Sequence, residues 1–209
     1  MGERSKDRPG VNYPTFREQF SLLNFSSNRK VPVISLFDMP KKLTKEKINI
    51  SICGLNCKPR KLTWRNLRLI KTEKKRLPLI CQIFNWGEFV KWEGWKLKDI
   101  LDKYNLAGKE NRYFTFSSRD GEYFESLSWE EAMDDRTMIV FKMDGKELSN
   151  EHGGPLRLIV PRVQGFKSVK WLDGIRSFRE DPKGIKFLLR QSLNHKLSKE
   201  IKKKYKIIE

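Results

Sequence analysis

The stretch from His152 to Trp171 reads HGGPLRLIVPRVQGFKSVKW, and it is hard to explain as ordinary scaffold. Two glycines and a proline precede a short apolar run of the kind that forms a buried strand. Three cations, Arg157, Lys167 and Lys170, lie around that run, so their charges are expected at its ends. Glycines also let a backbone approach a bound group closely. The pattern predicts a pocket for an anion.

The chain as a whole is strongly basic. Its 209 residues contain 44 Lys and Arg against 26 Asp and Glu, which gives a formal net charge of +18. A hydrophobic content of 38%, with 13 Phe and 6 Trp, is enough to fill one substantial core or two small ones. The charge favours anionic partners such as nucleic acid, acidic membranes, phosphate-bearing cofactors or oxyanions. Charge alone does not choose among them.

The cysteines bear on the cellular compartment. Cys53, Cys57 and Cys81 are an odd number, which argues against a disulfide framework and favours a reducing, cytoplasmic location. Structural zinc needs four ligands, and His152 and His195 are far from the cysteines and not paired in spacing. The first ten residues lack the apolar stretch of a signal peptide, and no window approaches the ~18 apolar residues of a membrane span. The sequence predicts a soluble protein without a transmembrane segment.

Periodicity along the rest of the chain predicts a mixture of short strands and short helices. At SLSWEEAMDD, Ser128 and Glu131 have capping-box spacing, which predicts the start of a short helix. Strand and helix do not alternate regularly, and there is no internal repeat or glycine-rich nucleotide loop. The expected fold class is therefore α+β rather than a doubly wound sheet. The other expected elements are strands at INISICGL (48–55), RYFTFSS (112–118) and TMIVFKM (137–143), an apolar run at RLPLICQIF (76–84), and helices at LTWRNLRLI (62–70), capped by Thr63, and WKLKDILDKYNL (95–106).

Composition divides the chain into three regions. Residues 1–44 contain four prolines and no sustained period, so we expect an extended arm packed on the domain. Residues 45–180 hold the domain itself. Residues 181–209 form a basic amphipathic helix or tail, with apolar residues at helical spacing. Its lysines are most simply a solvated face, and contact with nucleic acid or a membrane surface is the sharper alternative.

Cys81 ends an apolar run and precedes the aromatic-rich stretch IFNWGEFVKWEGW. A free cysteine in such a place is usually a small buried hydrophobe. The alternative is a catalytic or metal-binding thiolate, whose reactivity depends on whether nearby cations lower its pKa.

Taken in order, these segments resemble the molybdopterin-binding domain of the sulfite oxidase family. The resemblance rests on Cys81 followed by the W-x-G element that ends at Gly94, then on DGEYFESL (120–127), the DGKEL turn (144–148), HGGPLRLIVP and GFKSVKW. It covers about residues 45–180 and extends to small prokaryotic members similar to the catalytic subunit of methionine sulfoxide reductase P. It implies a sulfite oxidase-type α+β fold of mixed sheets with short helices.

The resemblance also implies a cofactor, molybdenum bound to one pyranopterin (molybdopterin). In the family a cysteine thiolate ligates the metal, and the matching residue is Cys81, which suits a soft, redox-active metal. Tyr123 matches an active-site tyrosine. His152 and Arg157 match the loop that binds the phosphate of the pterin, where a guanidinium binds phosphate bidentately. The remaining matched cofactor-binding residues are Ser168, Val169 and Lys170, with Ser117 and Ser118 near a position where relatives supply a hydroxyl.

Each of these residues also has an ordinary structural explanation. Arg157 can pair with a carboxylate, and Lys170 can face solvent. His152 can cap a turn. Tyr123 precedes a strand, where most tyrosines are packing residues.

The chain departs from relatives that oxidise sulfite. Those proteins carry an arginine-bearing element before the domain and further arginines just after the ligand cysteine. Here the corresponding stretches read SLFDMPKK (35–42) and CQIFNW (81–86), and neither contains arginine. Room is also lacking for the haem domain and the immunoglobulin-like dimerisation domain of eukaryotic sulfite oxidases. Sulfite is therefore disfavoured as the substrate.

The sequence thus predicts a molybdopterin-dependent oxidoreductase. It is expected to perform two-electron oxygen-atom transfer, or a related reduction, on a small-molecule substrate at a Cys-ligated centre, exchanging electrons with a separate carrier. One alternative is a basic nucleic-acid-binding protein, which steep salt dependence of binding without bound metal would identify. Another is a cofactor-free binding module on the same fold.

Overall fold

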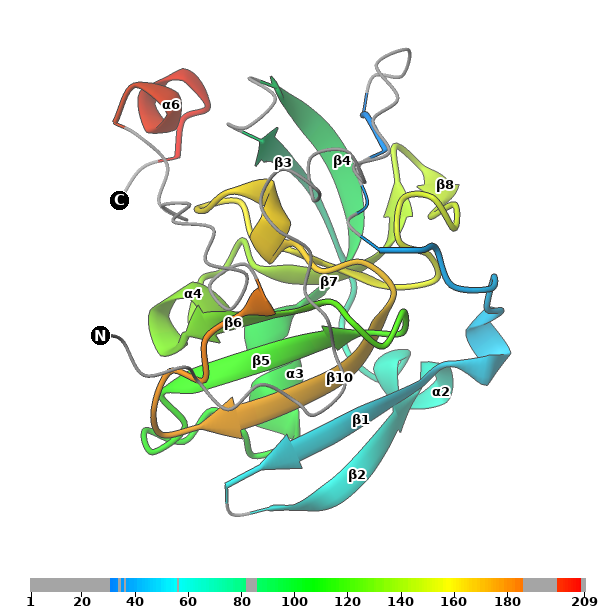
Figure 1. Ribbon diagram of the computed structural model, residues 1–209, viewed down its shortest axis with the longest axis vertical. Coiled ribbons are helices and arrows are strands. Elements are labelled where there is room, and N and C mark those ends of the chain that lie inside the picture. The colour runs from blue at the N-terminus through cyan, green and yellow to red at the C-terminus, as the bar shows by residue number, and fades with distance from the viewer. Residues whose placement is uncertain are drawn as a thin grey trace, which may run out of the picture.

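Two β-sheets form the body of the protein (Figure 1). The computed structural model describes residues 31–33, 35, 37–55, 57–81, 86–185 and 199–207. In the first sheet the strands lie in the order β2 (Cys57–Thr63), β1 (Asn49–Gly54), β10 (Leu172–Phe178), β5 (Tyr113–Ser118) and β6 (Phe124–Ser128). In the second the order is β3 (Glu73–Cys81), β4 (Trp86–Lys96), β7 (Met138–Met143) and β8 (Lys146–Glu147), and β9 (Arg157–Ile159) pairs with β7.

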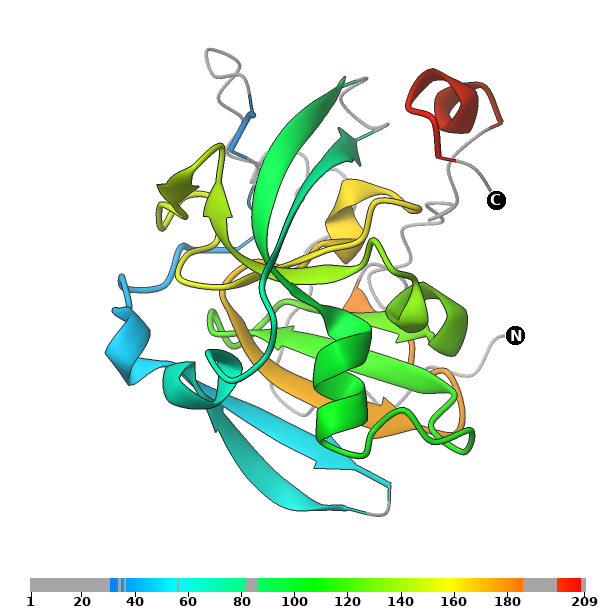
Figure 2. The same ribbon diagram turned by 180° about the vertical axis from the view of Figure 1, so that it is seen from behind.

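Among the described strands, β1 and β10 form the one parallel pair, with Ser51 opposite Gly174, and the other pairs are antiparallel. Short helices complete the fold, and Figures 1 and 2 place α3 against one face of the first sheet. This is the expected α+β arrangement, without alternating βαβ units. The helices are η1 (Lys45–Lys47), α2 (Trp64–Leu67), α3 (Leu97–Lys103), α4 (Trp129–Met133), η2 (Gly165–Lys167) and α6 (Lys199–Lys204).

The main core joins the two sheets through aromatic side chains. Trp95 is fully buried, with its ring centre 5.5 Å from that of Trp64 and 4.9 Å from that of Phe141. Gly94 lets β4 approach β7, because a Cβ atom there would lie 2.1 Å from the carbonyl oxygen of Ile139. The glycine of the W-x-G element therefore serves the packing of the second sheet.

The predicted helix caps are confirmed, but two helices are shorter than expected. The helix expected at 95–106 is α3, Leu97–Lys103. Ser128 and Glu131 form the predicted capping box of α4, and Thr63 caps α2. The expected helix at 62–70 is wrong at both ends, because Leu62 lies in β2 and Leu69 follows the helix with 72% of its surface exposed. The β2 strand was missed because its outward residues are charged, as is usual for an edge strand.

The ends of the chain are described in part. The Asn150 side chain donates a hydrogen bond to the Pro40 carbonyl (2.8 Å), and Arg119 donates one to the Lys41 carbonyl (2.7 Å), so the last residues of the expected arm contact the domain. The expected arm before residue 31 and the tail at 186–198, which includes His195, lie outside the described residues. Within the part of the chain that is described, no helix has the length and apolar composition to cross a bilayer.

Candidate cofactor site

The stretch from His152 to Trp171 folds back on itself. The Leu158 amide donates to the carbonyl of Val169 (2.8 Å), and the Trp171 amide donates to the carbonyl of Gly153 (3.1 Å). These two hydrogen bonds hold the loop before β9 next to the loop that follows η2. The two cationic ends of the stretch, separate in sequence, are thereby brought together.

Arg157 is a buried cation at the centre of this arrangement. Only 3% of its surface is exposed, and its guanidinium donates to the carbonyls of His152 (3.0 Å) and Ser168 (3.2 Å). Its Nε is buried without a hydrogen-bond partner, and among the described residues no carboxylate forms an ion pair with it. Burial lowers the pKa of Arg157 to about 10, with a smaller opposing effect of Tyr123. An unneutralised buried cation is costly unless an anion joins it.

Lys170 lies close to this cation. Its ammonium donates to the Glu151 carbonyl (2.8 Å) and lies 5.3 Å from the ring centre of Trp171. Burial, and then the charge of Arg157, lower the pKa of Lys170 to about 7, and Glu151 opposes them. Gly153, at φ +95°, lies beneath it, because a Cβ there would be 2.8 Å from the Lys170 Cβ. Arg157 and Lys170 repel each other in this low-dielectric site. A phosphate group would suit the pair, because its negative charge would raise both lowered pKa values.

Lys167, the third cation of the stretch, is engaged differently. It is 8% exposed, and its ammonium lies 3.4 Å from the carboxylate of Glu125, which is 1% exposed, and 2.5 Å from the Ser126 carbonyl. Gly184 packs tightly against this carboxylate, since a Cβ there would lie 1.9 Å from it. The structure thus separates Lys167 from the other two cations and gives it a buried ion pair.

Cys81 lies at the last position of β3, half-buried, and forms no disulfide bond. The η2 turn packs against this strand end, because a Cβ at Gly165 would be 2.9 Å from the Ile80 carbonyl oxygen. Among the described residues no group of three His, Cys, Asp or Glu side chains is placed to hold a metal ion. A metal at Cys81 would take its other ligands from a cofactor.

Tyr123 connects Cys81 to the cations. Its hydroxyl donates to the carbonyl of Phe166 in η2 (2.6 Å). Its pKa is raised well above the ordinary value, first by burial and then by the charges of Glu125, Asp120 and Cys81, while Arg157 opposes them. Tyr123 therefore lies within electrostatic range of both Cys81 and Arg157.

The other predicted residues lie around the same two loops. Ser168 is 4% exposed and accepts a hydrogen bond from the Val160 amide (3.0 Å), and Val169 is fully buried. His152 is 7% exposed, at the start of the first loop. Ser168 and Val169 thus support the loop, the first through its hydroxyl and the second through packing.

Ser117 and Ser118 end β5 beside this region, since the Arg119 amide donates to the Trp171 carbonyl (2.9 Å). Successive strand residues face opposite sides of a sheet, so the two hydroxyls diverge. Ser117 donates to Asp173 (3.2 Å), and the Ser118 hydroxyl accepts from the Asp120 amide (3.3 Å). Both hydroxyls are engaged locally.

Sequence reasoning missed two side chains of the site. The first is Trp92, because the Arg157 guanidinium lies over its indole ring, 5.6 Å from the ring centre. The second is Glu125, which neutralises Lys167. Trp92 belongs to the W-x-G element, so its neighbourhood was already singled out. Glu125 lies in FESLS (124–128), and its partner Lys167 is far away in sequence, so no local pattern indicated the pair.

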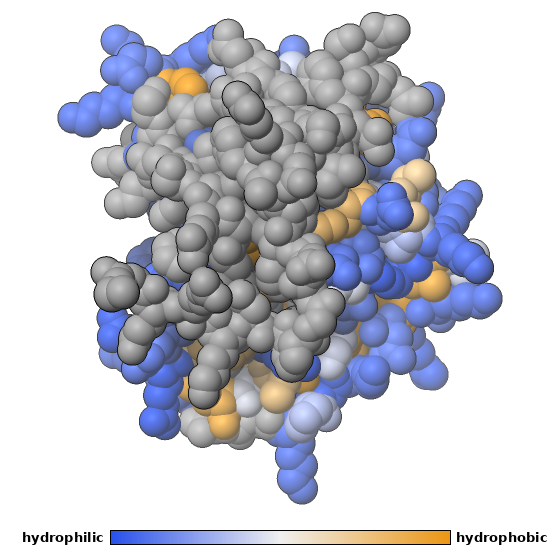
Figure 3. All heavy atoms as spheres, in the orientation of Figure 1, coloured by the Kyte–Doolittle hydropathy of each residue, from blue (hydrophilic) through white to orange (hydrophobic). Residues whose placement is uncertain are grey.

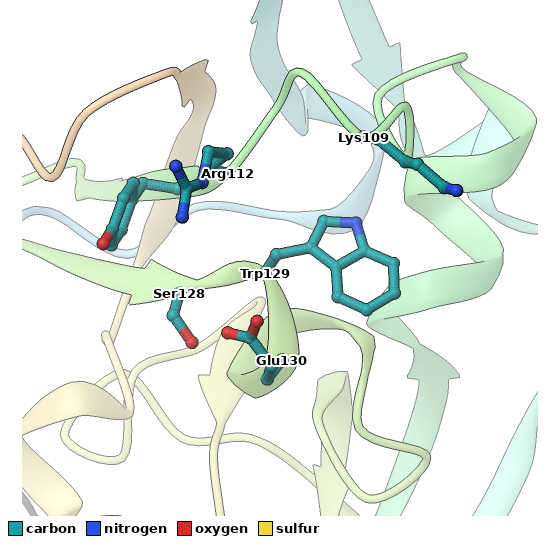
Figure 4. A pocket seen from close by; sticks show the side chains of 6 residues that line it. Lys109, Arg112, Ser128, Trp129 and Glu130 are labelled. Carbon is teal, nitrogen blue, oxygen red and sulfur yellow. The ribbon is translucent and has the colours of Figure 1, made fainter.

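Two cavities lie away from these residues. One, of about 330 Å³, is lined by Trp129, by Tyr113 at the start of β5 and by Ser128 at the end of β6 (Figure 4), and the exposed Lys109, Arg112 and Glu130 stand at its rim. The other, of about 260 Å³, reaches Gly154 and Pro155 on the side of the first loop that faces η1. Neither contains Cys81, Arg157 or Lys170.

Comparisons with known proteins agree with this arrangement. The family model for the oxidoreductase molybdopterin binding domain matches residues 36–186. The chain is 25% identical over 155 residues to the uncharacterized oxidoreductase YuiH of Bacillus subtilis, covering 74% of this chain and 77% of that one. It is 26% identical over 196 residues to the protein-methionine-sulfoxide reductase catalytic subunit MsrP of Campylobacter jejuni (87% and 62%), and 34% identical over 109 residues to the sulfite oxidase of Arabidopsis thaliana (45% and 28%).

A solved structure shows the same fold. The sulfane dehydrogenase SoxCD from Paracoccus pantotrophus superposes with a TM-score of 0.63 at 19% identity, over 89% of this chain and 57% of that one. The chain spans less than two thirds of SoxCD and of the MsrP and sulfite oxidase relatives named above.

Proposed function

The chain belongs to the oxidoreductase molybdopterin binding domain family and is an oxidoreductase, and from that premise we propose that Cys81 ligates molybdenum in a two-electron oxygen-atom transfer or a related reduction. The observation that carries the proposal is the buried Arg157 beside the half-buried Lys170 in the folded loops. Arg157 has a buried Nε without a partner, and desolvation, followed by the charge of Arg157, lowers the pKa of Lys170. Phosphate binding explains such a pair of cations better than exposure to solvent or packing in the core does.

Each residue has a distinct part in this proposal. Arg157 and Lys170 bind the phosphate, and the backbone around Gly153 approaches the pterin. Cys81 binds the metal as a thiolate. When bound, the cofactor supplies two-electron redox chemistry that amino-acid side chains lack. The residues that line the pterin are His152, Ser168 and Val169, with Ser117 and Ser118 at the end of β5.

Tyr123 acts as a neutral hydrogen-bonding group beside Cys81. Because burial and nearby anions raise its pKa well above the ordinary value, the phenol stays protonated at physiological pH. A protonated phenol adds no negative charge beside a thiolate. Its bond to the Phe166 carbonyl fixes the ring against η2.

The substrate is a small molecule, and electrons are exchanged with a separate carrier. Relatives are named for the reduction of methionine sulfoxide and for sulfite oxidation. The stretches that would supply sulfite-binding arginines contain none, so the removal of an oxygen atom from a sulfoxide is the reaction to assay first.

Elemental and pterin analysis of protein purified from a cofactor-producing host tests the proposal. We expect about one molybdenum and one pterin per chain. Cys81→Ser should abolish turnover and leave the fold and most of the pterin in place, because the phosphate contacts lie elsewhere. Cys53→Ser, which changes a half-exposed thiol on β1, is the matched control and should be silent.

Full turnover in Cys81→Ser would refute its role as the metal ligand. Protein that stays free of metal and binds nucleic acid with steep salt dependence would establish the basic-protein alternative. Protein that stays empty and binds neither would establish a cofactor-free module.

A further inference from the structure

The C-terminal segment at residues 199–207 lies beyond the region that the family model matches, and it packs on the β3–β4 hairpin. Tyr205 donates a hydrogen bond from its hydroxyl to the carbonyl of Gly87 (2.9 Å). Gly87 is shaped for this contact, because a Cβ there would lie 2.4 Å from the Tyr205 oxygen. Ile207, 5% exposed, packs against Ile80. In Figures 1 and 2, α6 lies beside the end of this hairpin.

The strand register places this segment directly behind Cys81. Ile80 pairs with Gly87, and the next pair is Cys81 with Trp86. Since side chains alternate along a strand, Ile80 and Gly87 face the C-terminal segment, and Cys81 faces the other side. The segment is therefore separated from the candidate metal ligand by the thickness of one strand.

A pair of packed aromatic rings on this surface is flanked by two cations. Arg76 lies over the ring of Phe89 (5.2 Å to its centre), the rings of Phe89 and Tyr205 are 5.6 Å apart, and Lys204 lies over the ring of Tyr205 (5.4 Å). Ile201 and Tyr205, four residues apart, hold α6 against the hairpin. The exposed lysines of the segment are Lys199, Lys203, Lys204 and Lys206, with Glu200 as its acidic residue.

We propose that this basic face, made of Arg76, Phe89, Tyr205 and those four lysines, is the docking surface for an acidic one-electron carrier protein. The inference rests on the proposed function, which needs such a carrier. Complementary charge raises the encounter rate and fixes orientation, and lysines on an anchored helix hold their positions. An electron from a carrier bound here would cross the thickness of one strand to reach the metal centre proposed at Cys81.

The same geometry favours a protein over single-stranded nucleic acid. Nucleic-acid platforms offer free aromatic faces on which bases stack. Here Phe89 packs against Tyr205, and each ring also has a cation over it.

The reduction of an oxygenated substrate consumes two electrons and two protons and releases water. Two reduced carriers therefore dock in turn, and each is oxidised by one electron.

Fluorescence anisotropy with a labelled acidic ferredoxin as the probe tests the surface at low ionic strength. The variant reverses three of its charges, Lys199→Glu, Lys203→Glu and Lys204→Glu. We expect its affinity for ferredoxin to fall by about tenfold or more relative to wild type. The control, Lys47→Glu with Lys58→Glu and Lys61→Glu, makes the same change in net charge at η1 and β2 and should fall by roughly twofold at most.

A second variant, Gly87→Ala, keeps the charge and displaces Tyr205, so it should also weaken ferredoxin binding. Circular dichroism checks that the variants fold. Equal ferredoxin affinity in wild type and both test variants would overturn the proposal. Tighter binding of a dT oligonucleotide of about 12 nucleotides, lost in the triple variant, would replace the carrier with nucleic acid.

The loaded enzyme separates this inference from the proposed function. Wild type and the triple variant should oxidise a small uncharged reduced dye equally fast, while the variant oxidises reduced ferredoxin about tenfold more slowly. No dye oxidation in wild type would refute the redox function. Equal ferredoxin rates with dye oxidation intact would refute only the docking surface.

Discussion

Lys170 donates a hydrogen bond to the Glu151 carbonyl in surroundings that lower its pKa to about 7. In the empty site at pH 8.5, most Lys170 side chains are therefore neutral. A bound dianion stabilises the ammonium form and raises the pKa, so anion binding should take up close to one proton per chain at pH 8.5 and far less at pH 6. Calorimetric titration of inorganic phosphate into metal-free protein, in two buffers of different ionisation enthalpy, measures this uptake.

Lys170→Arg is the matched control, because it keeps the charge and does not titrate in this range. It should bind phosphate without the extra proton. Equal uptake by the wild type and Lys170→Arg would contradict the assignment of the proton to Lys170.

The roles of single residues were predictable from the sequence where neighbours along the chain define them. Arg157 and Lys170 lie on either side of one apolar run. A strand with a loop at each end therefore predicted that the two cations lie close together. Lys167 belongs to the same run but contacts Glu125 on β6, a strand far away in sequence. Local pattern contains no information about such a partner, and only the packing of η2 on β6 decides it.

At the scale of elements, the Lys167–Glu125 pair ties η2 to β6. Lys167→Met would remove the cation that faces a fully buried carboxylate, at a cost of about 3–5 kcal/mol in the free energy of unfolding. Lys167→Met combined with Glu125→Gln removes both charges and should recover a large part of that loss. Urea unfolding of the metal-free protein measures both variants.

The control for this prediction is Lys183→Met, which removes a half-exposed cation that pairs with Asp181 and should cost at most about 1 kcal/mol. A Lys167→Met variant no less stable than this control would show that the buried pair does not hold η2 in place.

Elements with a strong local pattern were predictable, and those defined by distant pairing were not. The capping box of α4, the alternation of β1 and β5 and the apolar run of β7 lie in the sequence itself. β10 reads LDGIRSF, where Asp173 and Gly174 interrupt the alternation, and it becomes a central strand only between β1 and β5. Gly174 is needed there, since a Cβ would lie 2.2 Å from the Ser117 hydroxyl.

At the scale of the whole molecule, the chain carries a net charge of +18. On the face shown in Figure 3, most of the coloured atoms belong to hydrophilic residues, and hydrophobic residues show in small patches. The cations of the candidate site are Arg157 and Lys170, which are largely withdrawn from this surface. Composition indicates an anionic partner in general, while the folded loops bring these two cations to one place.

If Arg157 and Lys170 hold the cofactor as proposed, its binding is coupled to the stability of the whole molecule. A group that binds only the folded state stabilises it by about 4 kcal/mol when its concentration is about a thousand times its dissociation constant. We expect cofactor-loaded protein to melt at a higher temperature than metal-free protein. Arg157→Ala should lose most of this difference, and Lys47→Ala, on the exposed η1, should keep it. Equal melting temperatures for loaded and metal-free wild type would contradict the coupling.

The parallel pairing of β1 with β10 has a consequence for how the protein is made. A ribosome releases β1 early and β10 late, and the loops with Arg157 and Lys170 emerge between them. Until β10 is released, β1 lacks its central neighbour, and the first sheet remains in two parts. Pairing between segments so far apart is slow, because a long intervening chain must be closed first. Under the proposed function, loading of the cofactor would therefore follow translation, and a nascent chain stalled before Leu172 would present the loops proposed to bind phosphate without the sheet that supports them.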